Sequence, residues 1–277
     1  MVQYNYQAPW VPIFNNCVNG ELTATDHKPP FTTFQLATID KKSGYPKNRT
    51  LIYRGWLFNN KSSNVLIFTT DKRMEKYQEL LLDDKIEAVF WFSHIRKQFR
   101  LRGVAKIIDN EHIPNIDLSH INGNNSTNNN DSSNKDSNIQ NNSIQSSLLS
   151  PSHVDQKPQE DNQEQEDSHI DNVHNLIPPT NKEWEEELKR NWNDLSKTMK
   201  TSFRKPYPKS EMNDDNLKLI SKIQRGVDGK KDDDGFKNFV VVGLFINYVD
   251  YFEQDKDKRF IYELNDELHW EEKEVCP

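Results

Sequence analysis

The stretch RTLIYRG, residues 49–55, places an arginine at each end of a short run of strand-forming residues. Five residue steps separate Arg49 from Arg54, which is about 16 Å along a β-strand. Two cations at that spacing suit an extended anionic ligand laid along the strand. Because the number of steps is odd, the two side chains point to opposite faces of a regular strand. We therefore expect either a bulged or twisted strand, or an arginine that reaches around its end.

The sequence around this stretch alternates between strand patterns and turn-forming residues. Strands are predicted at residues 31–40, 49–58, 65–70, 86–92 and 97–108. Between the third and fourth strands, an apolar stripe predicts a helix at 71–84, with Asp71 as its N-cap. Short turns between strands, with one helix among them, favour an antiparallel barrel over alternating βα units.

The C-terminal part begins with a helix pattern and ends with strand patterns. A helix is predicted at residues 180–203, beginning at Thr180 or Asn181. Its apolar stripe, typical of core packing, consists of Trp184, Leu188, Trp192 and Leu195. Strand patterns follow at 239–253 and 259–275, and a turn at Asn265-Asp266 divides the second of these. The fold class is therefore mainly β with flanking helices.

The middle of the chain has a different composition. Residues 113–179 are rich in Asn, Ser, Gln and acidic residues and have few apolar ones. Such a segment cannot bury enough surface to offset its ordering entropy, so we predict a long disordered insertion. Residues 1–112 and 180–277 are expected to fold together as one domain, with the insertion looped out.

Composition excludes several classes of protein. Residues 1–110 hold 16 Lys and Arg against 10 Asp and Glu, which suits a small anionic ligand but falls short of a nucleic-acid surface. Two distant cysteines and no clustered histidine pattern predict neither a disulfide framework nor a metal site. No apolar run approaches the roughly 20 residues of a membrane span, and the N-terminus lacks a signal-peptide pattern. We expect a cytoplasmic protein without membrane or nucleic-acid partners; a nuclear location stays open.

The polar residues with chemical potential lie at strand ends. No nucleophile–base signature and no glycine-rich phosphate loop occurs, so any redox chemistry is expected to come from a cofactor. Thr69 and Thr70 end one strand, and Lys72, Arg73 and Lys76 follow within the next helical turns. Hydroxyls, free backbone N–H groups and cations at a strand-to-helix junction are the elements of a phosphate site.

These segments together resemble the FMN-binding split barrel of the pyridoxamine 5'-phosphate oxidase family. The resemblance is carried by FTTFQLATID (31–40), RTLIYRG (49–55), VLIFTTD (65–71), AVFWF (88–92), QFRLRG (98–103) and RFIYE (259–263). It is dense from about Pro29 to Ile108 and resumes near the C-terminus. It implies an antiparallel FMN-binding split β-barrel and a homodimer with FMN at the subunit interface.

The resemblance also implies roles for individual residues along the quoted strand. Arg49 is expected to hold the FMN phosphate, and the backbone of Thr50, Leu51 and Ile52 to lie along the flavin. Arg54 is expected near the flavin ring and the substrate, which makes it the best catalytic candidate. The remaining FMN contacts implied by the family pattern are Thr69, Thr70, Lys76, Gln98 and Arg259.

The chain departs from the family pattern at several of these positions. Met74 and Glu75 replace two residues that favour anions, so the phosphate is expected to rely on Arg49, Thr70 and Lys76. Phe252 stands where the standard enzymes have a flavin-side tryptophan, and DKDK (255–258) replaces the substrate-binding R-x-H. Arg54 replaces a lysine, and the two side chains are not interchangeable at a stacked or bidentate site.

The functional expectation is an FMN-binding oxidoreductase resembling pyridoxamine/pyridoxine 5'-phosphate oxidase. In that reaction FMN takes a hydride from a B6 vitamer phosphate and O₂ reoxidises the flavin. Two alternatives stay open because a fold does not fix a function. One is a non-catalytic flavin-binding protein, which the missing R-x-H favours; the other is a flavin reductase with another substrate on the same barrel.

Overall fold

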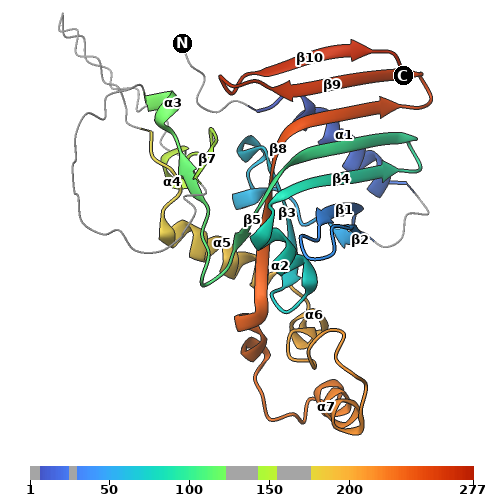
Figure 1. Ribbon diagram of the computed structural model, residues 1–277, viewed down its shortest axis with the longest axis vertical. Helices are drawn as coiled ribbons and strands as arrows, with labels where there is room; N and C mark the ends of the chain where they lie inside the picture. Colours follow the sequence, from blue (N-terminus) through green and yellow to red (C-terminus); the bar gives the residue numbers. More distant parts are fainter. Residues whose placement is uncertain (1–6, 25–29, 123–142, 155–175) are drawn as a thin grey trace, which may run out of the picture.

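The computed structural model describes residues 7–24, 30–122, 143–154 and 176–277, drawn in Figure 1. The strands are β1 (Thr33–Ile39), β2 (Pro46–Ile52), β3 (Val65–Asp71), β4 (Lys85–Phe92), β5 (Lys97–Ile108), β6 (Asn115–Asp117), β7 (Ser143–Gln145), β8 (Phe239–Glu253), β9 (Lys258–Leu264) and β10 (Trp270–Val275). The α-helices are α1 (Trp10–Leu22), α2 (Glu75–Leu82), α3 (Ser119–Asn122), α4 (Pro151–Val154), α5 (Asn181–Asn193), α6 (Lys197–Ser202) and α7 (Asp214–Gln224). Short 3₁₀ helices span Leu57–Asn59, Lys61–Ser63 and Asp232–Asn238.

The described residues build one eight-stranded antiparallel sheet around the core, which confirms the predicted fold class. Its strand order is β10-β9-β8-β5-β4-β1-β2, and β3 pairs with β8 off this path. The first half of β8 pairs with β3 and its second half pairs with β9, while β5 runs along its other edge. Because β8 changes partner midway, the sheet curls and splits. The parallel pair β6–β7 forms a separate small sheet.

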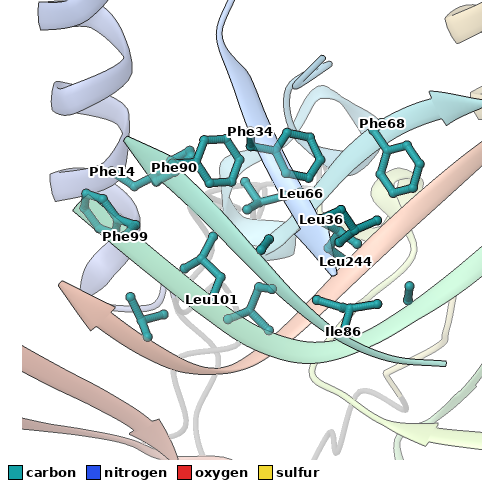
Figure 2. Close-up of a cluster of buried hydrophobic side chains, with 14 of the residues drawn as sticks. Phe14, Phe34, Leu36, Leu66, Phe68, Ile86, Phe90, Phe99, Leu101 and Leu244 are labelled. Atoms are coloured by element: carbon teal, nitrogen blue, oxygen red, sulfur yellow. The ribbon is translucent and has the colours of Figure 1, made fainter. Parts of the chain in front are cut away.

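The main hydrophobic core lies inside the curled sheet, between the strands and α1 (Figure 2). Its aromatic centre places Phe14 of α1 edge-to-face on Phe90 of β4, with ring centroids 4.9 Å apart. Phe34 of β1 stacks on Phe90 at 4.8 Å. Offset and edge-to-face ring contacts of this kind stabilise a core beyond the area that they bury. The core thus fixes β1, which pairs with β2, and β4, which pairs with the other edge of β1.

A second core lies under α5 and includes the stripe predicted for this helix. Thr180 caps the helix in a capping box with Glu183, as the sequence suggested, and Trp184, Leu188 and Trp192 are buried. Residues inside the predicted disordered segment also belong to this core. They are Ile116, Leu118, Leu148, Leu149 and Leu176.

The boundaries of the predicted insertion therefore need correction. Residues 113–122, 143–154 and 176–179 are described parts of the fold, and apolar side chains in an otherwise polar tract attach them to it. The rest of the predicted insertion, 123–142 and 155–175, lies outside the described residues. No helix in the described ranges is long and apolar enough to cross a membrane.

Three predicted element boundaries are also wrong. The strand predicted at 49–58 ends at Ile52. The helix predicted from Asp71 begins at Glu75, because the Asp71 carboxylate accepts hydrogen bonds from the backbone and side chain of Arg73 instead of capping a helix. The helix predicted at 180–203 breaks into α5 and α6, because Ser196 caps a new helix.

Gly103 on β5 provides a test of the close strand packing. A Cβ at this position would lie 2.0 Å from the Phe245 carbonyl oxygen, at a register shift between β5 and β8. Gly103→Ala should lower the free energy of unfolding by about 1–3 kcal/mol, because a backbone atom must move. Gly20→Ala is the control: its Cβ would meet Ile95 at an ordinary 3.6 Å, and alanine should stabilise helix α1 by about 0.5–1 kcal/mol. Urea denaturation measures both; a neutral Gly103→Ala would contradict this packing.

Candidate functional site

The two arginines of RTLIYRG lie in different parts of the structure, because the chain bends after β2. The Tyr53 amide still bonds to Thr32 on the β1 side, but the Arg54 amide donates to the Ile67 carbonyl of β3 at 2.9 Å. Gly55 has a φ of +98°, a backbone conformation that glycine adopts at little cost. The sequence left two arrangements open: a bulged or twisted strand, or an arginine that reaches around the end of the strand. The chain moves from β1 pairing to β3 pairing, so Arg54 lies beyond the end of the strand.

Arg49 lies at the edge of a cavity of about 730 Å³ at the other end of β2. The cavity is formed by the β1–β2 turn, α2 with the two residues before it, and the loop 207–210. Six Lys or Arg and three Asp or Glu line it, so its lining is cationic. Two of the predicted phosphate residues, Arg49 and Lys76, lie here together, although they are 27 positions apart in the sequence.

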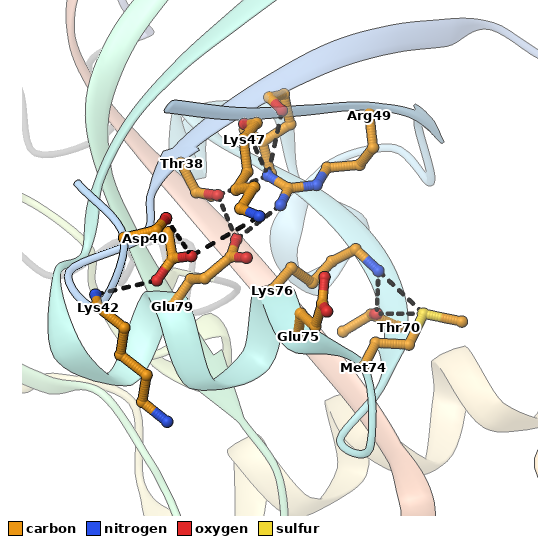
Figure 3. Close-up of polar contacts among 12 residues, drawn as sticks. Thr38, Asp40, Lys42, Lys47, Arg49, Thr70, Met74, Glu75, Lys76 and Glu79 are labelled. Atoms are coloured by element: carbon orange, nitrogen blue, oxygen red, sulfur yellow. Dashed lines mark hydrogen bonds and ion pairs between the residues drawn. The ribbon is translucent and has the colours of Figure 1, made fainter. Parts of the chain in front are cut away.

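Arg49 points to the core face of β2 and is held by a network (Figure 3). Its Nη2 donates to Glu79 Oε2 of α2 at 2.6 Å, and its Nη1 donates to Thr38 Oγ1 of β1 at 2.5 Å. Thr38 in turn donates to the same Glu79 oxygen. Both Thr38 and Glu79 are buried. The Arg49 charge therefore already has a carboxylate partner, and the network joins β1, β2 and α2.

Lys76 is the buried cation that this network leaves without a carboxylate. Only 8% of the residue is exposed, and its Nζ donates to Thr70 Oγ1 at 3.2 Å and lies 2.9 Å from Met74 Sδ. No carboxylate of the described residues forms an ion pair with it. Burial, and secondarily the neighbouring Arg49, lowers the pKa of Lys76 to about 8 from its usual 10.5. A buried ammonium beside a threonine hydroxyl, facing a cationic cavity, fits a phosphate group.

The residues that depart from the family pattern have partners of their own. Glu75 forms an ion pair with Lys209 at 2.6 Å, so its charge is not left facing the phosphate position. Met74 contacts both Thr70 and Lys76 through its sulfur. Neither side chain can donate a hydrogen bond to an anion, whereas Lys76 and Thr70 at the same junction both carry donors. The described residues hold no cluster of His, Cys, Asp or Glu that could bind a metal ion.

Arg54 lies away from this cavity and has no side-chain partner among the described residues. Its Nε is buried without a hydrogen bond, and burial lowers the pKa of its guanidinium. A buried donor left unpaired is costly unless a ligand supplies the acceptor. Arg54 therefore fits a ligand that reaches the far end of β2. Buried Lys76 of α2 thus lies at the cavity beside one part of β2, and half-buried Arg54 lies beyond the end of the strand.

Gln98 and Arg259 lie on the opposite face of the sheet from Arg49. Arg49 is in register with Leu36, which belongs to the core face. Gln98 is in register with Trp91 and Phe252, and Phe252 with Arg259, so the four share the outer face. Trp91 is 45% exposed there. The row therefore presents aromatic and polar side chains outward, remote from the Lys76 cavity.

Other sequence-predicted residues divide between the same two faces. Thr50 and Ile52 pair with Gln35 and Thr33 on the outer side, while Leu51 packs against the core. Thr69 is half-buried on β3 beside buried Thr70. Arg259 forms a two-point ion pair with Asp250, at 2.8 and 2.6 Å. Two groups of residues, in the Arg49 network and in the cavity wall, were missed by sequence reasoning. The first group is Thr38 and Glu79, and the second is the loop 207–210. The sequence does place Glu79 three positions after Lys76, close enough on a helix to suggest that it lies near the same site.

The pKa of Lys76 predicts how FMN affinity depends on pH. Phosphate prefers the protonated lysine, and above a pKa of about 8 that form is lost, so the FMN dissociation constant should rise roughly tenfold or more between pH 7 and 9.5. Lys76→Arg keeps its charge over this range and should show a flat profile. Flavin fluorescence titration measures both. The same flat profile for wild type and Lys76→Arg would show that Lys76 does not contact the phosphate.

Comparison with known sequences gives a family match and two relatives. The family described as "Pyridoxamine 5'-phosphate oxidase, FMN-binding domain" matches residues 7–109. The "Uncharacterized protein YGR017W" of Saccharomyces cerevisiae is 33% identical over 307 residues, covering 98% of both chains. "Pyridoxine/pyridoxamine 5'-phosphate oxidase 2" of Arabidopsis thaliana is 35% identical over 102 residues, which are 37% of this chain and 48% of the plant protein.

Solved structures share the fold. A pyridoxamine 5'-phosphate oxidase-related, FMN-binding protein from Nostoc punctiforme superposes with a TM-score of 0.62 at 19% identity, over 99% of this chain and 100% of the other. PhzG from Burkholderia lata, solved with tetrahydrophenazine-1-carboxylic acid, gives a TM-score of 0.57 at 13% identity, over 100% and 97%. The chain belongs to the pyridoxamine 5'-phosphate oxidase-like family of FMN-binding split barrels, and its cofactor is FMN.

Proposed function

We propose that this chain is an FMN-dependent oxidoreductase that oxidises a small phosphorylated amine or alcohol of the B6 vitamer type. The observation that carries the proposal is buried Lys76, which has Thr70 beside it, no carboxylate partner among the described residues, and an open cationic cavity in front of it. FMN supplies the hydride acceptor when bound. The chain's own residues bind the cofactor, orient it and set the charge around it.

In this proposal FMN lies along β2, with its phosphate on Lys76 and Thr70. β2 is the last strand of the main path of the described sheet, so one side of its backbone has no strand partner on that path. The flavin can use those backbone groups while its ring lies toward Arg54, about one strand length from the phosphate. Arg54 then supplies a positive charge and the buried Nε–H that the described residues leave unpaired. Arg49 acts mainly by holding Glu79 and Thr38 in place.

The outer-face row supports a homodimer. Gln98, Phe252 and Arg259 are the other residues that the family pattern assigns to the flavin, yet they lie on the face of the sheet opposite Arg49. One chain cannot turn both faces of its sheet toward one flavin. We therefore propose that this row contacts the FMN held by a second copy, and that exposed Trp91 packs in the same interface.

One observation favours a flavin-binding protein without B6 oxidase turnover. Asp250 already neutralises Arg259, and DKDK (255–258) occupies the position of the family's R-x-H. An arginine in a two-point ion pair has fewer donors left for a substrate phosphate. The plant relative's B6 substrates, on the other hand, support the oxidase proposal. The experiment that follows decides between the two.

The FMN-loaded protein should be mixed with pyridoxamine 5'-phosphate without oxygen, and the flavin absorbance near 450 nm followed. The oxidase proposal expects bleaching that reverses when O₂ is admitted. Arg54→Ala should keep FMN, because the phosphate site is intact, but bleach at least tenfold more slowly, an effect that corresponds to about 1.4 kcal/mol. A yellow protein whose flavin stays oxidised would exclude the oxidase activity and leave the flavin-binding alternative.

Subunit complementation tests the shared site. Lys76→Ala removes the phosphate contact, and the double variant Gln98→Ala/Phe252→Ala removes the outer-face contact, so each variant alone should bind FMN weakly. When the two are co-expressed, mixed dimers contain one site with both halves intact, and about one quarter of all sites should regain normal affinity. Light scattering gives the mass of each species. If the mixture binds no more FMN than its components, both halves of the site come from one chain.

A further inference from the structure

The cavity at Lys76 extends away from the proposed flavin. Arg49 and Lys76 stand at one side of it, and from there it continues toward Asp40, Lys41 and Lys42 in the β1–β2 turn. Arg54, where the flavin ring is proposed, lies at the opposite end of β2. The volume of about 730 Å³ is in the range of sites for whole small molecules, and a single phosphate fills only a small part of it.

One wall of the cavity is the loop 207–210, which is attached to the residues at the start of α2. Arg73, just before α2, donates to the carbonyl oxygens of Phe203 at 3.1 Å and Lys205 at 2.7 Å. The ion pair between Lys209 and Glu75 ties the loop to the first turn of α2. The Ser210 amide closes a turn on the Tyr207 carbonyl at 3.0 Å. This wall is therefore held in place by hydrogen bonds and an ion pair.

The lining combines exposed apolar side chains with an unpaired cation. Tyr207 is 60% exposed and Leu82 is 57% exposed, and both face the cavity together with Met74. Lys42 also lines it, and its ammonium forms no ion pair with the described residues; in Figure 3 it extends away from the Arg49 network. Flat apolar surface beside a cation suits a planar aromatic group that carries a phosphate.

We propose that this cavity binds an adenylate group next to the FMN phosphate. Tyr207 would stack on the adenine, Leu82 and Met74 would contact its edges, and Lys42 and Lys76 would share the phosphates. The group could be the adenosine monophosphate half of FAD, joined to the flavin nucleotide by a pyrophosphate, or a free adenine nucleotide that binds beside FMN. The proposal rests on the FMN phosphate lying at Lys76, as argued above.

Binding of FMN, FAD and adenosine monophosphate to the flavin-free protein distinguishes the outcomes. Calorimetry should show FAD binding at least as tightly as FMN if the adenylate arrives as part of the dinucleotide. If the nucleotide is a separate ligand, adenosine monophosphate should bind the FMN-loaded protein with saturation while FAD gains nothing over FMN. FAD binding at least tenfold weaker than FMN, together with no saturable adenosine monophosphate binding, overturns the proposal. If the flavin-free protein does not bind FMN at all, the result would instead overturn the proposed FMN phosphate site at Lys76.

Variants of the wall give a second, independent readout. Tyr207→Ala should weaken binding of the adenylate ligand roughly fivefold or more, because a base–aromatic stack is lost, and should change FMN affinity less than twofold. Tyr207→Phe keeps the ring and should restore binding. Lys42→Ser should weaken adenylate binding most at low salt, whereas Lys61→Ser, a matched exposed lysine outside the cavity, should have no effect. Equal losses of FMN and adenylate affinity in Tyr207→Ala would contradict a separate adenylate site.

Discussion

The phosphate end of the site depends on one buried ion pair, between Arg49 of β2 and Glu79 of α2. Thr38 of β1 bonds to both partners, so three elements meet in one network. A buried ion pair of this kind adds little net stability, because desolvation offsets most of its attraction, but its geometry holds α2 against the sheet. Its chemical consequence concerns Lys76, one turn earlier on α2. Glu79 pairs with Arg49, so the Lys76 charge is available for a phosphate.

Side-chain alternation along β2 imposes the second constraint. The residue that pairs with Leu36 faces the core, and its neighbours in sequence face outward. Arg49 is thereby committed to the inner network, and the chain reaches Arg54 only after it leaves β1 and bonds to β3. The bend places half-buried Arg54 beyond the end of β2, away from the cavity that Arg49 and Lys76 line. The proposed FMN has its phosphate at this cavity and its ring toward Arg54.

Much of this architecture could be predicted from the sequence, and the failures have physical reasons. Strand patterns and the strand-end Thr70–Lys76 cluster are local signals; the strand patterns led to the correct fold, and the cluster lies beside the cavity where the phosphate is proposed. The Arg49–Glu79 pair joins residues 30 positions apart, and a single sequence does not show which of several carboxylates an arginine will meet. Asp71 fits an N-cap by residue type, but its neighbour Arg73 competes successfully for the carboxylate. Strand alternation also does not say which face of a sheet is covered, so it could not show that Trp91 is exposed on the outer face.

Glu75 and Lys209 show how a departure from the family pattern can be compensated and reused. A glutamate carboxylate beside a phosphate would repel it, because both groups are negatively charged. Lys209 removes that repulsion and, in the same contact, anchors the loop that carries Tyr207 to α2. Glu75 thus adds one anchor to a loop that Arg73 also holds, through its hydrogen bonds to the Phe203 and Lys205 carbonyl oxygens. In the proposed site, a residue that cannot bind the phosphate therefore helps to hold the wall of the cavity beside it.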